Sequence, residues 1–281
     1  MPHLEWVRHP ELRSPVALLA FSGWGDAGDA STDAAGHLIA SLEGDAFARI
    51  DPDEFFEFQA RRPEVEMTEA GVRTIRWPRN EFHALHHPDG DLVVVLGEEP
   101  HLRWRAFGSA ITEVLTSLGV ARALLLGAFL GQVPHTVPVP LVGSSPTPRQ
   151  LMENGVSSSR YEGPTGIVGS LTHQLNESGI ETISVWAAVP HYLSNQPYPP
   201  AVYALVKKAM AILELSFDAS DLAVAAAEFK FNVDSVISGN EELSEYVKKL
   251  EAVVEDEAAE ESHPDPATEL VQEIERFLRD T

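Results

Sequence analysis

Apolar and polar residues alternate along the first 240 residues in two distinct patterns. Short continuous apolar runs occur at 16–21, 91–97, 121–127 and 182–189. Runs of this length and continuity are typical of strands that are covered on both faces. Between them, apolar residues recur at helical spacing, as at Ala30, Ala34 and Leu38. This alternation predicts a mostly parallel sheet flanked by helices, with right-handed crossover connections.

The stretch between residues 53 and 85 has a different texture. The segments 55–58, 72–77 and 82–85 have the length and composition of short strands. We expect some of these strands to pair antiparallel around a turn at 69–71, whose sequence is Glu-Ala-Gly.

The chain is predicted to be mostly helical from Pro199 onward. Prolines at 199 and 200 suit a first helical turn, and Asp218 or Ser220 can cap the helix that follows. Helical spacing returns at 243–254 and again at 267–279. The sequence SHPDP at 262–266 separates these two helices, because its prolines forbid a continuous helix.

Acidic residues concentrate at the C-terminal end of the chain. The 281 residues include 43 acidic and 20 basic ones, for a net charge of −23, and 14 of the acidic residues lie in 241–281 with only 4 basic ones. We therefore divide the chain into an α/β domain, 1–240, and an acidic helical C-terminal extension, 241–281, docked on the body or on a partner. Nucleic acid is not an expected partner, because nonspecific binding needs a basic surface.

Composition excludes several further classes of protein. Cysteine is absent, which excludes thiol catalysis, Cys-ligated metals and disulfides. We expect no membrane association, because no run of about 18 apolar residues occurs. Residues 1–15 are rich in charge and have no apolar core of a signal peptide, so we expect a cytoplasmic protein.

Polar and aromatic residues follow each of the four predicted core strands. The carboxyl ends of parallel strands meet at one edge of a sheet, and ligands bind there. The segments 22–29, 97–104, 127–136 and 189–192 should therefore converge. The candidates for a ligand cleft, including those of a nearby loop, are Trp24, Asp26, Glu99, Arg103, His135, Tyr161, Glu162, Thr165 and His191.

The first of these segments contains a glycine pattern. Gly23, Gly25 and Gly28 fit G-x-G-x-x-G, but Trp24 and Asp26 place bulk and negative charge where a pyrophosphate needs bare backbone. A tight strand-to-helix turn, capped by Asp26 or Asp29, is the favoured interpretation. We expect no nucleotide cofactor.

The segment 161–166 (YEGPTG) precedes a predicted helix. Pro164 at the helix start leaves neighbouring N–H groups free to face an anion, and Thr165 adds a hydroxyl group. No lysine follows, which excludes a Walker loop. A structural turn and an anion site both remain open. Arg103 likewise suits either an anionic ligand or an ion pair with a nearby carboxylate.

Two histidines follow successive long strands in matching Val-Pro-His triplets. His135 and His191, with a carboxylate such as Asp26 or Glu99, have the residue types of a metal site or an acid–base pair. The alternative is that both rings form hydrogen bonds to the backbone, and we predict no metal. No Gly-x-Ser-x-Gly elbow occurs, so a serine hydrolase is excluded.

Five motifs, in chain order, resemble the PAC2 (proteasome assembly chaperone 2) family in its actinobacterial-type form. They are PVALLAFSGWGDAG, GEEPHLRW, GAFLGQVPHT, RYEGPTGI and WAAVPHYL, and the match covers about 16–237. The resemblance implies an α/β fold similar to purine nucleoside phosphorylases, a phosphorylase/hydrolase-like architecture, and a tendency to form homo-oligomers.

The resemblance also implies protein partners. Eukaryotic and archaeal relatives bind proteasome α subunits or immature core particles, some through a C-terminal hydrophobic–Tyr–any-residue motif. This chain ends in FLRDT at 277–281, without a penultimate tyrosine. The family supplies no established catalytic residue to transfer.

Three functional hypotheses follow. The first is a non-catalytic protein-binding or assembly factor, acting on proteasome components. The second is an enzyme or small-ligand-binding protein that uses the strand-end cleft for a nucleoside-, phosphate- or carboxylate-type ligand. The third is an oligomeric scaffold without a small ligand. The resemblance and the missing nucleophile favour the first hypothesis.

Overall fold

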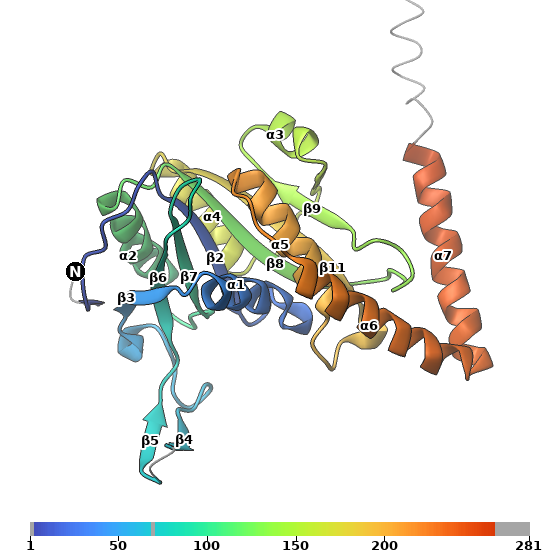
Figure 1. Cartoon of the computed structure of the whole chain (residues 1–281), viewed down its shortest axis with the longest axis horizontal. Coiled ribbons are helices and arrows are strands. Elements are labelled where there is room, and N and C mark those ends of the chain that lie inside the picture. Colours follow the sequence, from blue (N-terminus) through green and yellow to red (C-terminus); the bar gives the residue numbers. More distant parts are fainter. Residues whose placement is uncertain (1–2, 69–70, 262–281) are drawn as a thin grey trace, which may run out of the picture.

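A nine-stranded mixed sheet forms the centre of the molecule (Figure 1). A computed structural model describes residues 3–68 and 71–261. The strands of the sheet lie in the order β1-β3-β6-β7-β2-β8-β11-β9-β10, and a separate two-stranded hairpin contains β4 and β5. Four central strands, β7, β2, β8 and β11, are mutually parallel. The α/β fold with a mostly parallel core is as predicted.

The strands are β1 (Leu4–Trp6), β2 (Val16–Ser22), β3 (Asp45–Ile50), β4 (Glu64–Met67), β5 (Arg73–Arg76), β6 (Asn80–Leu85), β7 (Leu92–Glu98), β8 (Arg122–Gly131), β9 (Leu141–Ser144), β10 (Ser157–Ser158) and β11 (Glu181–Pro190). The α-helices are α1 (Ala30–Ser41), α2 (Trp104–Ser117), α3 (Pro148–Glu153), α4 (Ile167–Glu177), α5 (Pro199–Leu213), α6 (Ser220–Ser238) and α7 (Glu241–Glu261). Three short 3-10 helices are η1 (Ala27–Asp29), η2 (Pro52–Glu54) and η3 (His191–Leu193).

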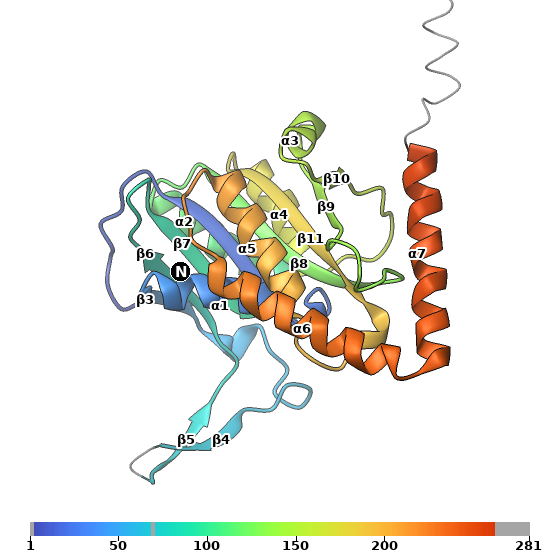
Figure 2. The same cartoon turned by 45° about the vertical axis from the view of Figure 1, so that its right-hand side comes forward.

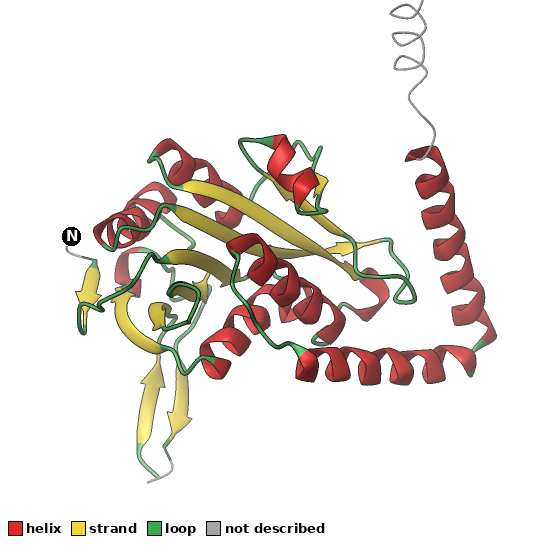
Figure 3. Cartoon of the chain, turned by 45° about the horizontal axis from the view of Figure 1, so that its top comes forward, coloured by secondary structure: helices red, strands yellow, loops and turns green. Residues whose placement is uncertain are grey.

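Helices cover both faces of the central strands (Figure 3). Alternate residues of a strand face opposite sides, so Leu18 of β2 packs with α1 and α5. Its neighbour Leu19 packs on the other face, where α2 and α4 lie. Burial on both faces explains why the four core strands appear in the sequence as continuous apolar runs.

The regions flanking the parallel core differ partly from expectation. The predicted strands at 72–77 and 82–85 are β5 and β6, and β5 pairs antiparallel with β4. The segment 55–58 is not a strand. It follows η2 in a turn, where Phe55 is fully buried and lies edge-on to Phe107 with ring centroids 5.4 Å apart. Phe55 and Phe56 are therefore both buried because this turn packs against the core.

The hairpin of β4 and β5 projects from one end of the body, and α6 and α7 extend from another (Figure 2). Neither predicted cap occupies the N-cap position of α6, which is Ala219 and has no capping side chain. Asp218 precedes it, and its carboxylate accepts a hydrogen bond from the N–H of Ser220, at 3.0 Å. The predicted helix at 267–279 and the breaker at 262–266 lie outside the described residues. Within those residues, no helix is long and apolar enough to cross a membrane.

Candidate functional site

The four polar segments that follow the core strands meet at one edge of the sheet. Strand β2 pairs parallel with β7 and β8, and β8 pairs parallel with β11, so all four carboxyl ends point the same way. In register, Ser22 is opposite Glu98, and Gly131 is opposite Pro190. We call this edge, with the turns that leave it, the strand-end rim.

Two cavities open along the strand-end rim, and Gly23 and Trp24 border both of them. The first cavity, about 720 Å³, is lined by Gly23, Trp24, Asp26, Ala27, Gly28, Asp29, Ala128, Phe129, Leu130, Trp186 and residues 194–197. The second cavity, about 570 Å³, is lined by Gly23, Trp24, Glu57, Glu99, Pro100, His101, Leu102, Trp104, Pro164, Thr165 and Gly166. Among the predicted residues, Trp24 and Asp26 thus line the first cavity, and Trp24, Glu99 and Thr165 line the second.

Asp26 is a buried carboxylate that organises the turn after β2. Its Oδ1 accepts hydrogen bonds from the N–H and hydroxyl of Ser31, at 2.7 and 2.6 Å, and its Oδ2 accepts one from the hydroxyl of Thr32, at 2.5 Å. Burial raises the pKa of Asp26, although these hydrogen bonds oppose the effect. Both oxygens are engaged by the start of α1, as predicted for a capping residue; Asp29 makes no such side-chain bond.

Glu99 joins two other parts of the rim. Its Oε1 accepts a hydrogen bond from the N–H of Ile167, at 2.7 Å, and its Oε2 accepts one from the N–H of Trp24, at 3.2 Å. The carboxylate therefore lies at the N-terminus of α4, where the exposed N–H groups and the helix dipole favour an anion. A side chain at Gly166 would bring its Cβ within 2.9 Å of Glu99 Oε1. Of the two interpretations of the segment 161–166, an anion does lie at the start of the helix, and it is the Glu99 carboxylate of the chain itself.

The remaining candidates of this region lie at the surface. Tyr161 and Glu162 are exposed, and the Tyr161 hydroxyl donates a hydrogen bond to the carbonyl of Pro164, at 3.1 Å. Arg103 begins α2 in a left-handed conformation, with φ of 55°, and forms an ion pair with Glu54. This ion pair is one of the two roles considered for Arg103.

His135 attaches the loop after β8 to α6. Its ring is buried, with Nε2 3.0 Å from Asp234 Oδ1 and Nδ1 2.7 Å from the Tyr192 hydroxyl. That hydroxyl also accepts a hydrogen bond from the N–H of His135, at 2.8 Å. All three contacts are satisfied when Tyr192 donates to Nδ1 and Nε2–H donates to Asp234. Burial is the main reason that the pKa of Tyr192 rises to about 12, which keeps the hydroxyl protonated as a donor.

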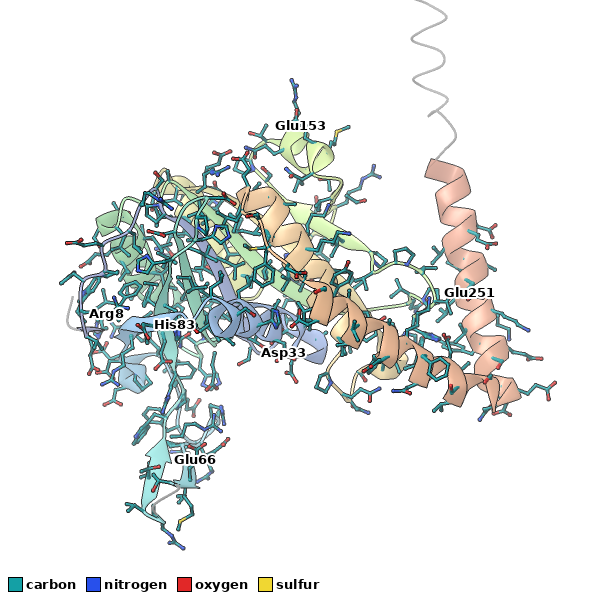
Figure 4. All side chains as sticks on the ribbon, viewed as in Figure 1. Arg8, Asp33, Glu66, His83, Glu153 and Glu251 are labelled. Carbon is teal, nitrogen blue, oxygen red and sulfur yellow. The ribbon has the colours of Figure 1, made fainter. Side chains whose placement is uncertain are left out.

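His191 attaches the end of β8 to α7. Its Nδ1 lies 3.1 Å from the carbonyl of Gly131, which can only accept, so Nδ1–H is the donor. Its Nε2 then accepts from the hydroxyl of Tyr246, at 2.7 Å. Nearby, Glu251, which Figure 4 labels on α7, accepts a hydrogen bond from the Thr136 hydroxyl, at 2.5 Å. Both histidines thus connect the rim to the C-terminal helices, and His191 makes the backbone hydrogen bond that was the alternative to a metal site.

The ionisable candidates of the rim make contacts within the chain. Within residues 3–68 and 71–261, no three His, Asp or Glu side chains gather as a metal site requires. The carboxylates of Asp26 and Glu99 and the rings of His135 and His191 all have hydrogen-bond partners in the chain. Large apolar side chains are exposed along the rim, namely Trp24, Leu102, Phe129 and Leu130, and exposed polar residues such as Asp29 and Glu57 border them.

Sequence reasoning identified only Trp24 and Asp26 of the first cavity, and it missed the large apolar residues Phe129, Leu130 and Trp186. Phe129 and Leu130 are exposed at the end of β8. Trp186 of β11 lies flat over β8, where a Cβ at Gly127 would come within 2.4 Å of its ring. One signal in the sequence pointed to Phe129 and Leu130. The predicted strand ends at residue 127, yet these two large apolar residues follow it, immediately before Gly131.

Comparison with known proteins gives one family. The profile of the PAC2 family matches residues 20–237. Among curated proteins, no sequence matches the chain significantly.

Solved structures give matches over most of the chain. A PAC2 family protein from Streptomyces avermitilis is 38% identical, with a TM-score of 0.76, over 83% of this chain and 99% of that one. A proteasome-assembly chaperone homologue from Mycobacterium tuberculosis is 36% identical, with a TM-score of 0.76, over the same shares of the two chains. PbaB from Pyrococcus furiosus, an archaeal proteasome activator, shares the fold at 18% identity, with a TM-score of 0.65, over 84% of this chain and 99% of that one.

Proposed function

The chain belongs to the PAC2 family, and we propose that it is a non-catalytic protein-binding assembly factor that acts on proteasome components in the cytoplasm. The observation that carries this proposal is the contrast between hydrogen-bonded carboxylates and exposed apolar side chains at the strand-end rim. The buried Asp26 carboxylate and the Glu99 carboxylate are hydrogen-bonded within the chain. Trp24 and Leu130, by contrast, are 65% and 51% exposed. Exposed apolar side chains rimmed by polar residues are typical of protein interaction sites.

The comparisons support a protein partner of this kind. The relative from Mycobacterium tuberculosis, at 36% identity, is described as a proteasome-assembly chaperone homologue. A large aromatic side chain such as Trp24 is well suited to anchor such an interface.

Purified proteasome α and β subunits from the same organism test the proposal. The wild-type chain should bind a subunit or an assembly intermediate and raise the rate of core-particle formation on native gels. Leu130→Asp should weaken that binding at least about tenfold, because it places a charge in the apolar contact.

Met152→Asp is the matched control, because Met152 is 78% exposed on α3, away from the rim, and should leave binding unchanged. If the wild type binds neither isolated subunits nor intermediates at micromolar concentrations, the assembly role is wrong.

The first cavity supports a second candidate, a small-ligand-binding protein. Its lining contains Trp24, Phe129 and Trp186 but no Lys, Arg or His. Of the ligand types considered, a nucleoside therefore fits better than a phosphate or carboxylate, because its ring can stack on aromatic faces without a counter-charge. Saturable quenching of tryptophan fluorescence by nucleosides, lost in Trp24→Ala, would favour this candidate.

We also propose that the protein self-associates. The hairpin and the C-terminal helices both extend from the body (Figure 2). Both carry exposed apolar side chains, such as Val65 and Phe231. Such surfaces are costly to leave in water and are characteristic of interfaces.

A further inference from the structure

The hairpin of β4 and β5, which we call the hairpin arm, has a polar face with paired charges and an apolar face that is exposed to solvent. Residues directly opposite in the register share a face, so Glu64 and Glu66 lie with Arg76 on one side. Arg76 forms ion pairs with both glutamates, with 2.5 Å between its Nε and Glu66 Oε1. The labelled Glu66 lies on this projecting element (Figure 4). The polar face therefore needs no partner.

The other face of the hairpin arm is apolar and uncovered. It presents Val65, Met67 and Ile75, which are 66%, 62% and 56% exposed, together with Arg73 opposite Met67. A two-stranded hairpin alone is marginally stable in water, and an exposed apolar sheet face is an interaction site or an aggregation hazard. We therefore expect another protein surface to cover this face.

Helices α6 and α7, which we call the helical arm, carry a second uncovered surface. Val224, Glu228 and Phe231 are spaced four and three residues apart on α6, so they share one side of the helix. Val224 and Phe231 are 58% and 71% exposed, while Val233, on another side, is buried. The hairpin arm and the helical arm lie apart in every ribbon view, so one chain cannot bring them together (Figures 1, 2 and 3).

The two surfaces have opposite charge. Residues 61–79 contain five arginines and three glutamates, in a chain whose net charge is −23. Residues 220–261 contain 12 acidic and 3 basic residues. Arg73 on the hairpin arm and Glu228 on the helical arm each stand beside the exposed apolar side chains, and within the described residues neither has an ion-pair partner. Complementary charge of this kind fixes orientation and speeds association.

We propose that the apolar face of the hairpin arm docks on the Val224–Phe231 side of α6 in a second copy of this chain, with Arg73 facing Glu228. This deepens the self-association proposed above and rests on it. Two different surfaces meet, so the interface is head-to-tail. Every open assembly therefore keeps one free hairpin surface and one free helix surface until a ring closes. The acidic helical arm is thereby given a partner within the protein's own assembly.

Sedimentation velocity on the full-length chain tests the interface with two defective variants. Ile75→Asp removes the hairpin surface and Phe231→Asp removes the helix surface, and each should raise the dissociation constant at least about tenfold. Both side chains are more than half exposed, so the thermal transitions should match the wild type. Met152→Asp, on neither surface, should associate like the wild type.

Mixing the two defective variants gives the decisive result. A head-to-tail interface leaves one intact surface on each variant, so the 1:1 mixture should form a heterodimer that neither variant forms alone. A mixture that stays monomeric overturns the proposal, as does a Phe231→Asp variant that still associates, which would indicate contact between two hairpin arms.

Charge reversal provides an independent arm of the test. Arg73→Glu and Glu228→Arg should each weaken association, and the double variant should recover it; no recovery contradicts the pairing. If the wild type oligomerises but neither surface matters, only this interface is wrong. A monomeric wild type overturns self-association altogether and indicates that these surfaces serve another protein, while the assembly role is tested separately with proteasome subunits.

Discussion

At the scale of single residues, the strand-end rim shows carboxylates used as parts of the scaffold. Asp26 and Glu99 stand where sequence patterns place catalytic or ligand-binding groups, and each accepts N–H hydrogen bonds at the start of a helix. A carboxylate in this position stabilises the helix terminus through the unpaired N–H groups and the dipole. The N–H groups that could bind a ligand anion are bound here by carboxylates of the chain itself.

Asp26 should make stability depend on pH in a defined direction. Burial raises the pKa of Asp26 above its usual 3.8, so the folded state binds this proton more tightly than the unfolded state does. The ionised carboxylate therefore lowers stability at neutral pH, and the disadvantage is relieved as the pH falls through the raised pKa. In urea titrations, the free energy of unfolding of the wild type should gain on that of Asp26→Asn as the pH is lowered from 7 towards 4.

The control for this measurement is Asp29→Asn, which removes an exposed carboxylate from the same turn. The free energy of unfolding of the wild type minus that of Asp26→Asn should rise as the solution is acidified; a value that stays constant with pH, or falls, would contradict the assignment.

At the scale of elements, the core strands could be predicted from sequence more reliably than their surroundings. Strands β2 and β7 follow the apolar runs closely because both faces of each strand are buried. The run 55–58 was misassigned because consecutive buried aromatic residues occur in a turn as well as in a strand. A run of apolar residues indicates that a segment is buried. The spacing of apolar residues identifies a helix or a strand only when one face of the element is exposed to solvent.

The attachment of α6 by His135 is testable at this scale. His135→Ala removes the contacts with Tyr192 and Asp234 and leaves a buried polar gap, so it should cost about 2–3 kcal/mol of stability. Hydrogen exchange should accelerate in α6. The exposed His173 of α4, substituted by alanine, is the matched control and should change neither quantity appreciably.

A different outcome would change the role of His135. Unaltered stability and exchange, combined with loss of binding to a nucleoside, would make this histidine a ligand-binding residue of the second candidate function.

At the scale of the whole molecule, the body and its extensions differ in how they are held. The body has a large apolar core on each face of the sheet. Among the described side chains of α7, by contrast, only Val247 and Leu250 are buried apolar ones, and Tyr246 and Glu251 form hydrogen bonds to the body. The boundary proposed at residue 240 falls between α6 and α7.

A chain ending at residue 240 should therefore fold. Loss of two buried apolar side chains and two hydrogen bonds, offset by the entropy of ordering the helix, should lower stability by roughly 2–4 kcal/mol. Thermal unfolding followed by circular dichroism should keep one cooperative transition at a lower midpoint. A chain ending at 261 is the control, and failure of the shorter chain alone to fold would show that α7 belongs to the body.

The sequence by itself determined the parallel core, the meeting of four polar segments at one edge and the family. These features follow from local patterns, because a buried strand must be apolar and the direction of parallel strands brings their ends together. Only the tertiary structure decided what the polar side chains at that edge do. Glu99 meets Ile167 across 68 residues of sequence, and His135 meets Asp234 across 99. Whether a polar group is free or bound depends on such distant partners, and no local pattern contains them.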